Sequence, residues 1–156
     1  DFFSNSKALA KALINEDNPD LIMGGTKIIN PRSGKKLRLW KASMPSKIKI
    51  FLGWLPAHPS FIVKRSVAMK AAPYDLKYKT SADYGFMIRA ILRSKKIETR
   101  QHTITVMRSG GLTNSSLSSR INIIFDIWRQ MFELKYYNFL YPITKWIFKL
   151  AQVITR

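Results

Sequence analysis

Four segments of the chain have the hydrophobic pattern of β-strands. Residues 21–29 are an apolar, β-favouring run that contains Gly24-Gly25, and residues 35–41 alternate leucine with cations after a turn sequence. Residues 61–63 are a short apolar run, and residues 99–108 alternate again. We therefore expect these four segments to build a mixed sheet, with a bulge or a close backbone approach at the two glycines.

Apolar residues at helical spacing lie between these segments. Residues 6–16 place Leu9 and Leu13 on one face, and residues 82–93 place Ile88 and Ile91 within a second helix. Shorter helices are expected at 46–52 and 66–72. The fold class is therefore predicted to be α/β, with helices 6–16 and 82–93 packed against the mixed sheet.

The last forty residues, 117–156, have a different character. Two apolar stripes recur at helical spacing, one through Ile124 and Trp128 and the next through Ile143 and Ile147, each opposite a polar or cationic face. Charged residues interrupt every stretch long enough to span a bilayer, which needs about 18 apolar residues. We expect amphipathic helices that lie in a membrane interface. Packing of the same faces on the domain's own core or on a partner is the open alternative.

Charge and composition narrow the class of partner. Lys and Arg total 27 against 9 acidic residues, which gives a net charge of +18, and 46% of the residues are hydrophobic. The hydrophobic fraction indicates a globular domain, and the charge favours a polyanionic partner such as nucleic acid, anionic lipid or a phosphate-bearing substrate. The chain has no cysteine, which excludes disulfides, thiolate metal sites and a cysteine nucleophile.

The ordered motifs lie between residues 56 and 114. In sequence they are Pro56-Ala57-His58-Pro59-Ser60-Phe61, Lys64-Arg65, Tyr74-Asp75, Ser81-Ala82-Asp83-Tyr84 and Ser109-Gly110-Gly111-Leu112-Thr113-Asn114. This order resembles the second half of family-2 glycosyltransferases, which have the GT-A fold of nucleotide-diphospho-sugar transferases. In such enzymes a histidine stretch leads to a phenylalanine and basic residues, an acidic helix start follows, and a Gly-Gly loop closes the domain.

The resemblance implies a catalytic role for Asp83. An inverting sugar transfer is a single displacement at the anomeric carbon, and one carboxylate must deprotonate the acceptor hydroxyl as it attacks. In the family the aspartate at the helix start is that base. The alternative is that Asp83 only stabilises the first turn of its helix, where a negative charge is favoured.

The remaining site residues are also implied by the resemblance. Asp1, followed by two phenylalanines, resembles the last residue of the aspartate motif that holds a divalent ion, Mg²⁺ or Mn²⁺, on the donor diphosphate. His58 is expected to contact the diphosphate, the metal or the acceptor, or else to be a loop histidine satisfied by backbone. Backbone amides of a Gly-rich turn can contact phosphate, so Arg108, Ser109, Gly110 and Gly111 are the further candidate donor or acceptor contacts. The alternative is that these residues only form a turn that ends the strand.

These expectations give one primary function and two alternatives. Residues 1–116 are expected to be the acceptor-side part of a glycosyltransferase, inactive alone, that moves a sugar from a nucleotide-sugar donor to a lipid-linked or glycan acceptor. Residues 117–156 would hold it as a peripheral protein at the anionic cytoplasmic face of the cell membrane. In this primary function no nucleic-acid partner is expected. The alternatives are a basic nucleic-acid-binding module, which explains the charge but not the motif order, and a non-catalytic membrane-surface adaptor.

Overall fold

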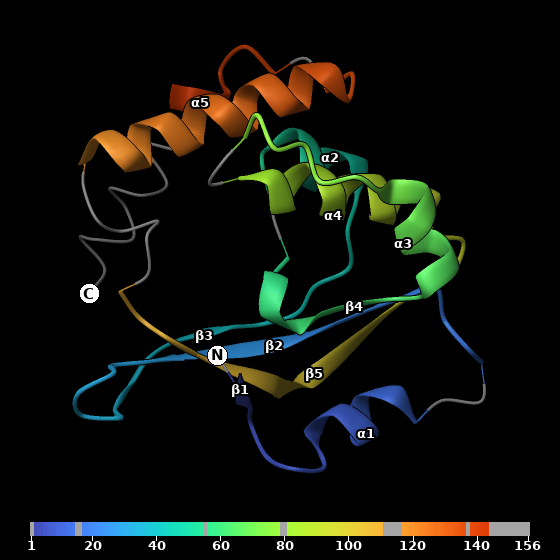
Figure 1. Cartoon of the computed structure of the whole chain (residues 1–156), viewed down its shortest axis with the longest axis vertical. Coiled ribbons are helices and arrows are strands. Elements are labelled where there is room, and N and C mark those ends of the chain that lie inside the picture. Colours follow the sequence, from blue (N-terminus) through green and yellow to red (C-terminus); the bar gives the residue numbers. More distant parts are fainter. Residues whose placement is uncertain are drawn as a thin grey trace.

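The computed structural model describes residues 2–14, 17–54, 56–78, 81–110, 117–136 and 138–143. Within them the chain forms an α/β structure whose five-stranded mixed sheet has the order β1-β5-β2-β3, with β4 also paired to β2 (Figure 1). The strands are β1 (Phe2–Phe3), β2 (Leu21–Ile29), β3 (Lys36–Trp40), β4 (Phe61–Val63) and β5 (Ile97–Arg108). The α/β class and the four predicted strands are confirmed, and β1 is an addition.

The centre of the sheet is the parallel pair β2 and β5. Their register extends from Leu21 opposite Ile97 to Ile29 opposite Arg108. β3 and β4 pair antiparallel with the other edge of β2, β4 along its first three residues and β3 along its last four. β1 pairs antiparallel with the far edge of β5. The carboxyl ends of the two central strands therefore lie at the same end of the sheet.

The predicted irregularity at Gly24 and Gly25 is present. The register between β2 and β5 shifts on both sides of Gly25. A Cβ added to Gly24 would overlap the side chain of Ile104, which is fully buried on β5. Glycine is therefore required at position 24 because the neighbouring strand's side chain occupies the space above it.

Helices cover both faces of the sheet. The helix α1 (Ala8–Leu13) lies alone on one face, whereas α2 (Lys47–Phe51), α3 (Arg65–Ala71), α4 (Ala82–Arg93) and α5 (Leu117–Glu133) lie on the other (Figure 1). The α4 boundaries are those predicted, and α2 begins after Ser46, whose hydroxyl accepts the Lys49 backbone N–H at 3.1 Å. Within the described residues, no helix is both long and apolar enough to cross a bilayer.

The main core lies between the sheet and the helices α2, α4 and α5. Its buried residues come from β2, the three helices and the segment 138–143: Leu21, Met23, Ile50, Tyr84, Ile88, Ile91, Ile124, Met131 and Tyr141. A smaller cluster joins α3 to α4 through Val67, Ala71, Phe86, Met87 and Ala90. Because the core uses residues from both ends of the described chain, these elements stabilise one another.

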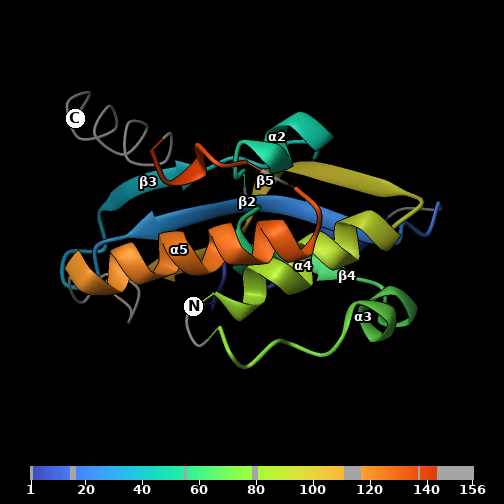
Figure 2. The same cartoon turned by 90° about the horizontal axis from the view of Figure 1, so that it is seen from above.

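The helix α5 lies beside α4, on the same face of the sheet, in both views of the molecule (Figures 1 and 2). Ile124 and Met131, at positions that the sequence pattern predicts for a membrane, are 6% and 0% exposed in the main core. Phe125 on the outer side remains 45% exposed. The inner face of α5 is thus core, which is the alternative that the pattern left open. Residues 144–156 lie outside the described residues.

Candidate functional site

The candidate site lies toward the carboxyl ends of β2 and β5. The two strands end side by side, and the Ser109 backbone N–H donates to the Ile29 carbonyl at 2.9 Å just beyond the last pair. The helix α4 runs back in the opposite direction to β5, so its first turn points toward these ends (Figure 1). In open α/β sheets, ligands bind beyond the carboxyl ends of parallel strands and near helix N-termini.

Asp83 occupies the first turn of α4 and is half-buried. Its Oδ1 accepts the backbone N–H of Tyr84 at 2.9 Å, while no side-chain cap bond comes from Ser81, the residue at the N-cap. The N-terminal end of a helix favours a carboxylate over a carboxylic acid, because the unpaired N–H groups there carry partial positive charge. The bond to Tyr84 fixes the orientation of the Asp83 side chain at the start of α4.

Tyr74 lies close enough to Asp83 for the charge of the carboxylate to affect the pKa of its hydroxyl. The pKa of the Tyr74 hydroxyl is raised, first by burial and then by the negative charge of Asp83. The Tyr74 ring stacks on Phe86 of α4, with centroids 4.6 Å apart and planes at 13°. The sequence pattern placed Tyr74 within a motif without a role, and the structure adds it to the surroundings of Asp83.

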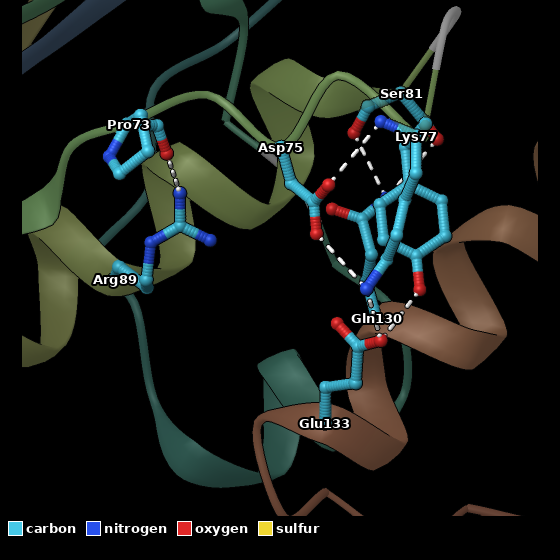
Figure 3. Close-up of polar contacts among 8 residues, drawn as sticks. Pro73, Asp75, Lys77, Ser81, Arg89, Gln130 and Glu133 are labelled. Atoms are coloured by element: carbon cyan, nitrogen blue, oxygen red, sulfur yellow. Dashed lines mark hydrogen bonds and ion pairs between the residues drawn. The ribbon is translucent and has the colours of Figure 1, made fainter.

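The segment that leads into α4 is fixed by ion pairs and hydrogen bonds. Lys77 Nζ lies 3.0 Å from Asp75 and 2.7 Å from Glu133 of α5, and the Tyr78 hydroxyl donates to the same Glu133 oxygen at 2.9 Å (Figure 3). These contacts keep the pKa of Lys77 above its usual value, mainly through Glu133 and then Asp75. The exposed carboxylates contribute little energy individually, but together they fix the approach to Asp83.

Three further hydrogen bonds hold the same segment at its ends. Arg89 of α4 donates through Nε to the Ala71 carbonyl at 2.7 Å and through Nη2 to the Pro73 carbonyl at 2.6 Å. Gln130 of α5 donates from Nε2 to the carbonyl of Ser81 at 3.0 Å (Figure 3). Gln130 and Glu133 are partners that the sequence pattern could not identify, since they lie about fifty residues from the segment that they hold.

His58 lies exposed at the start of the short 3-10 helix His58–Ser60. This helix is anchored through Ser60, whose buried hydroxyl donates to the Gly25 carbonyl at 2.9 Å and lies 2.7 Å from Thr26 Oγ1. Thr26 Oγ1 is in turn 3.0 Å from Thr105 Oγ1 on β5. This buried hydroxyl cluster joins β2, β5 and the helix, so it fixes the backbone that presents His58 to solvent.

The last residue of β5 and the residues after it were also predicted to contact donor or acceptor. Arg108 is exposed, with its guanidinium carbon 5.8 Å from the centroid of the Phe2 ring. The Ser109 amide is already bonded to Ile29, so that N–H does not face a ligand in this conformation. Gly110 has φ of +103°, which favours glycine, and its surroundings are open. Gly111 lies outside the described residues.

The predicted metal ligand, Asp1, also lies outside the described residues. Among the residues that are described, His, Asp and Glu side chains form no group of three or more that could hold a metal ion. Asp83 lies on α4, His58 on the 3-10 helix 58–60 and Arg108 at the end of β5, and no hydrogen bond in the described part of the chain joins them.

Comparison with known proteins adds nothing to this geometry. The chain matches no protein-family model, no curated protein and no solved structure.

Proposed function

We propose that the chain is the acceptor-side, catalytic-base part of an inverting glycosyltransferase with a GT-A fold. It would transfer a sugar from a nucleotide-sugar donor to a lipid-linked or glycan acceptor. It would do so as a peripheral protein at the cytoplasmic face of the membrane. The observation that carries this proposal is the position of Asp83. It lies in the first turn of α4, toward the carboxyl ends of the parallel strands, within the motif order that resembles the family.

The chemistry assigned to Asp83 is a proton transfer. As the acceptor oxygen forms its bond to the anomeric carbon, the bond from that carbon to the diphosphate oxygen breaks, and the acceptor proton passes to the Asp83 carboxylate. The configuration at the anomeric carbon inverts. The bonds from α5 to the preceding segment restrict the position of the Asp83 carboxylate.

The diphosphate leaving group needs positive charge. A divalent ion, Mg²⁺ or Mn²⁺, would supply that charge when bound, with Asp1 as the proposed protein ligand. His58 and Arg108 are the proposed additional contacts to donor or acceptor. Both are exposed: His58 begins the 3-10 helix that the hydroxyl cluster anchors, and Arg108 ends β5, which the pairing with β2 fixes in place.

The test is sugar transfer by the complete protein as the cell makes it. Nucleoside diphosphate release and glycosylated product are measured with a panel of nucleotide sugars and lipid-linked or glycan acceptors, in the presence of Mg²⁺ or Mn²⁺. Asp83→Asn is expected to lower transfer by about 10² to 10⁴-fold because the general base is lost. Donor affinity, measured by calorimetry, is expected to stay nearly unchanged.

The matched control is Asp126→Asn, which removes a partly buried carboxylate from α5. It is expected to retain transfer. Full activity in the Asp83→Asn protein would reject Asp83 as the base. Tight, salt-sensitive binding of nucleic acid without any transfer by the wild-type protein would favour the nucleic-acid-binding alternative instead.

A further inference from the structure

Two segments far apart in sequence expose an unusual number of large apolar side chains. On α2 and the residue after it, these side chains are 41% to 72% exposed, and on segment 138–143 they are 58% to 71% exposed. We call them together the apolar edge, formed by Ile48, Phe51, Leu52, Phe139, Leu140 and Ile143. Ile48, Phe51 and Leu52 are spaced i, i+3 and i+4, while Ile50 between them is buried in the core.

The apolar edge is one surface because its two segments are fastened together. Asn138 Nδ2 donates to the Phe51 carbonyl at 2.7 Å. Gly53, with φ of +75°, approaches the buried Tyr141 ring so closely that a Cβ there would overlap it. Both views show α2 beside the red segment that follows α5 (Figures 1 and 2). The exposed side chains thus extend from a rigid, core-anchored base.

The charge around the apolar edge has one sign. The sequence contains no acidic residue from Leu21 to Tyr74 and none after Glu133. Lys47, Lys49 and Lys135 lie in or next to the two segments; Lys47 and Lys135 are exposed, and Lys49 is half-buried. Among the described ion pairs, no carboxylate pairs with these three lysines. An apolar centre with a cationic rim matches the acyl boundary and headgroups of an anionic bilayer.

We propose that the apolar edge inserts into the surface of an anionic membrane. This inference rests on the membrane location of the proposed function. It places the membrane contact on α2 and segment 138–143 instead of on the inner face of α5. Scattered apolar residues are ordinary on a protein surface, but a contiguous rigid patch marks an interaction site.

The test is co-sedimentation of the 156-residue chain with vesicles of phosphatidylglycerol and phosphatidylcholine. Ile48→Ser combined with Phe139→Ser is expected to lower the partition coefficient at least tenfold, because the two side chains are 72% and 71% exposed. The matched control combines Met69→Ser with Leu76→Ser, which are 68% and 81% exposed but lie away from the apolar edge. The control is expected to bind like wild type.

Salt distinguishes the electrostatic contribution of the lysines from the apolar insertion. Lys47→Gln and Lys135→Gln are each expected to weaken binding about fivefold at low salt and much less at 0.5 M salt. Wild-type binding is expected to persist in part at 0.5 M salt because apolar insertion is not screened. Thermal unfolding of all variants is expected to match wild type, since the replaced side chains are exposed.

Three results would overturn the inference. The first is unchanged vesicle binding by the double serine variant, and the second is failure of the wild-type chain to bind anionic vesicles at all. The third is a dimer in sedimentation equilibrium that Ile48→Ser with Phe139→Ser dissolves, because the edge would then join two copies. Sugar transfer is measured separately on a water-soluble acceptor, so loss of the proposed chemistry and loss of the proposed docking give different results.

Discussion

Gln130 of α5 donates both hydrogens of its amide nitrogen to Ser81, one to the backbone carbonyl at 3.0 Å and one to the hydroxyl at 3.1 Å. Gln130 is 3% exposed and Ser81 is 2% exposed. Ser81 is the N-cap residue of α4, two positions before Asp83. A helix from the last part of the described chain therefore fixes the start of the helix that carries the proposed base.

Loss of this contact is expected to destabilise the protein. Gln130→Ala leaves the buried carbonyl and hydroxyl of Ser81 without these donors, which typically costs about 1–3 kcal/mol in the free energy of unfolding. Ser81→Ala removes only the hydroxyl bond and is expected to cost about 0.5–1.5 kcal/mol. Urea unfolding measures both. A change below about 0.5 kcal/mol for Gln130→Ala would show that the bond contributes nothing net.

The contact between Gly53 and Tyr141 gives a second prediction. Gly53→Ala introduces a Cβ into the space of a fully buried ring and forces alanine to a φ of +75°. The expected cost is about 2–4 kcal/mol, from left-handed strain together with overpacking. Gly34→Ala is the matched control, because its φ is +66° and its surroundings are open. The control is expected to cost only the strain, about 1–2 kcal/mol.

Equal losses in the two glycine variants would mean that the backbone conformation alone matters and that segment 138–143 yields to the added methyl group. A larger loss at position 53, measured as a shift in the urea midpoint at constant slope, would show that this segment is packed rigidly on the α2 turn.

Local pattern predicted most of the fold. Residues 21–29 and 82–93 were located to the residue because strand alternation, apolar spacing and the chemistry of helix ends act over a few neighbours. β1 was missed because two residues carry no periodicity. The role of the inner face of α5 was ambiguous because the sequence of an apolar stripe does not show whether the protein core or a membrane covers it. The burial of Ile124 and Met131 among distant residues of the core shows that the core covers it.

The candidate site was predictable to a similar extent. Asp83 could be placed at a helix start from its neighbours in sequence, and the structure puts it there. Its surroundings could not be predicted, because Tyr74 reaches it through a turn in the chain and Glu133 and Gln130 approach from a helix about fifty residues away. No spacing rule relates such positions.

The pH dependence of stability gives a third prediction. Asp20, just before β2, accepts the backbone N–H groups of Lys95 and Lys96 at 2.8 and 3.3 Å, and these bonds lower its pKa below the ordinary 3.8. A carboxyl whose folded pKa is depressed stabilises the fold above its unfolded pKa, and the contribution is lost as pH falls through the folded value. Asp20→Asn is therefore expected to unfold at lower temperature than wild type at pH 7.

The two melting temperatures are expected to converge as the pH falls below 3.8 and through the lower pKa of folded Asp20, because the wild-type carboxyl then becomes uncharged too. The difference at pH 7 is expected to persist in 0.5 M salt, since the amide hydrogen bonds are the largest causes of the shift and the charges of Lys64 and Lys95 rank below them. A difference that stays constant from pH 7 to pH 3 would show that ionisation of Asp20 does not stabilise the fold.

The last prediction decides how α5 contributes to the molecule. Met131 is fully buried in a core cluster with residues of β2, α2 and α4, so truncation leaves a cavity that the surrounding elements cannot easily fill. Met131→Ala is expected to lower the free energy of unfolding by about 2–5 kcal/mol. Asn122→Ala, an exposed change on the same helix, is expected to stay within about 0.5 kcal/mol of wild type. If Met131→Ala were as stable as Asn122→Ala yet bound vesicles less well, the inner face of α5 would meet the membrane rather than the core.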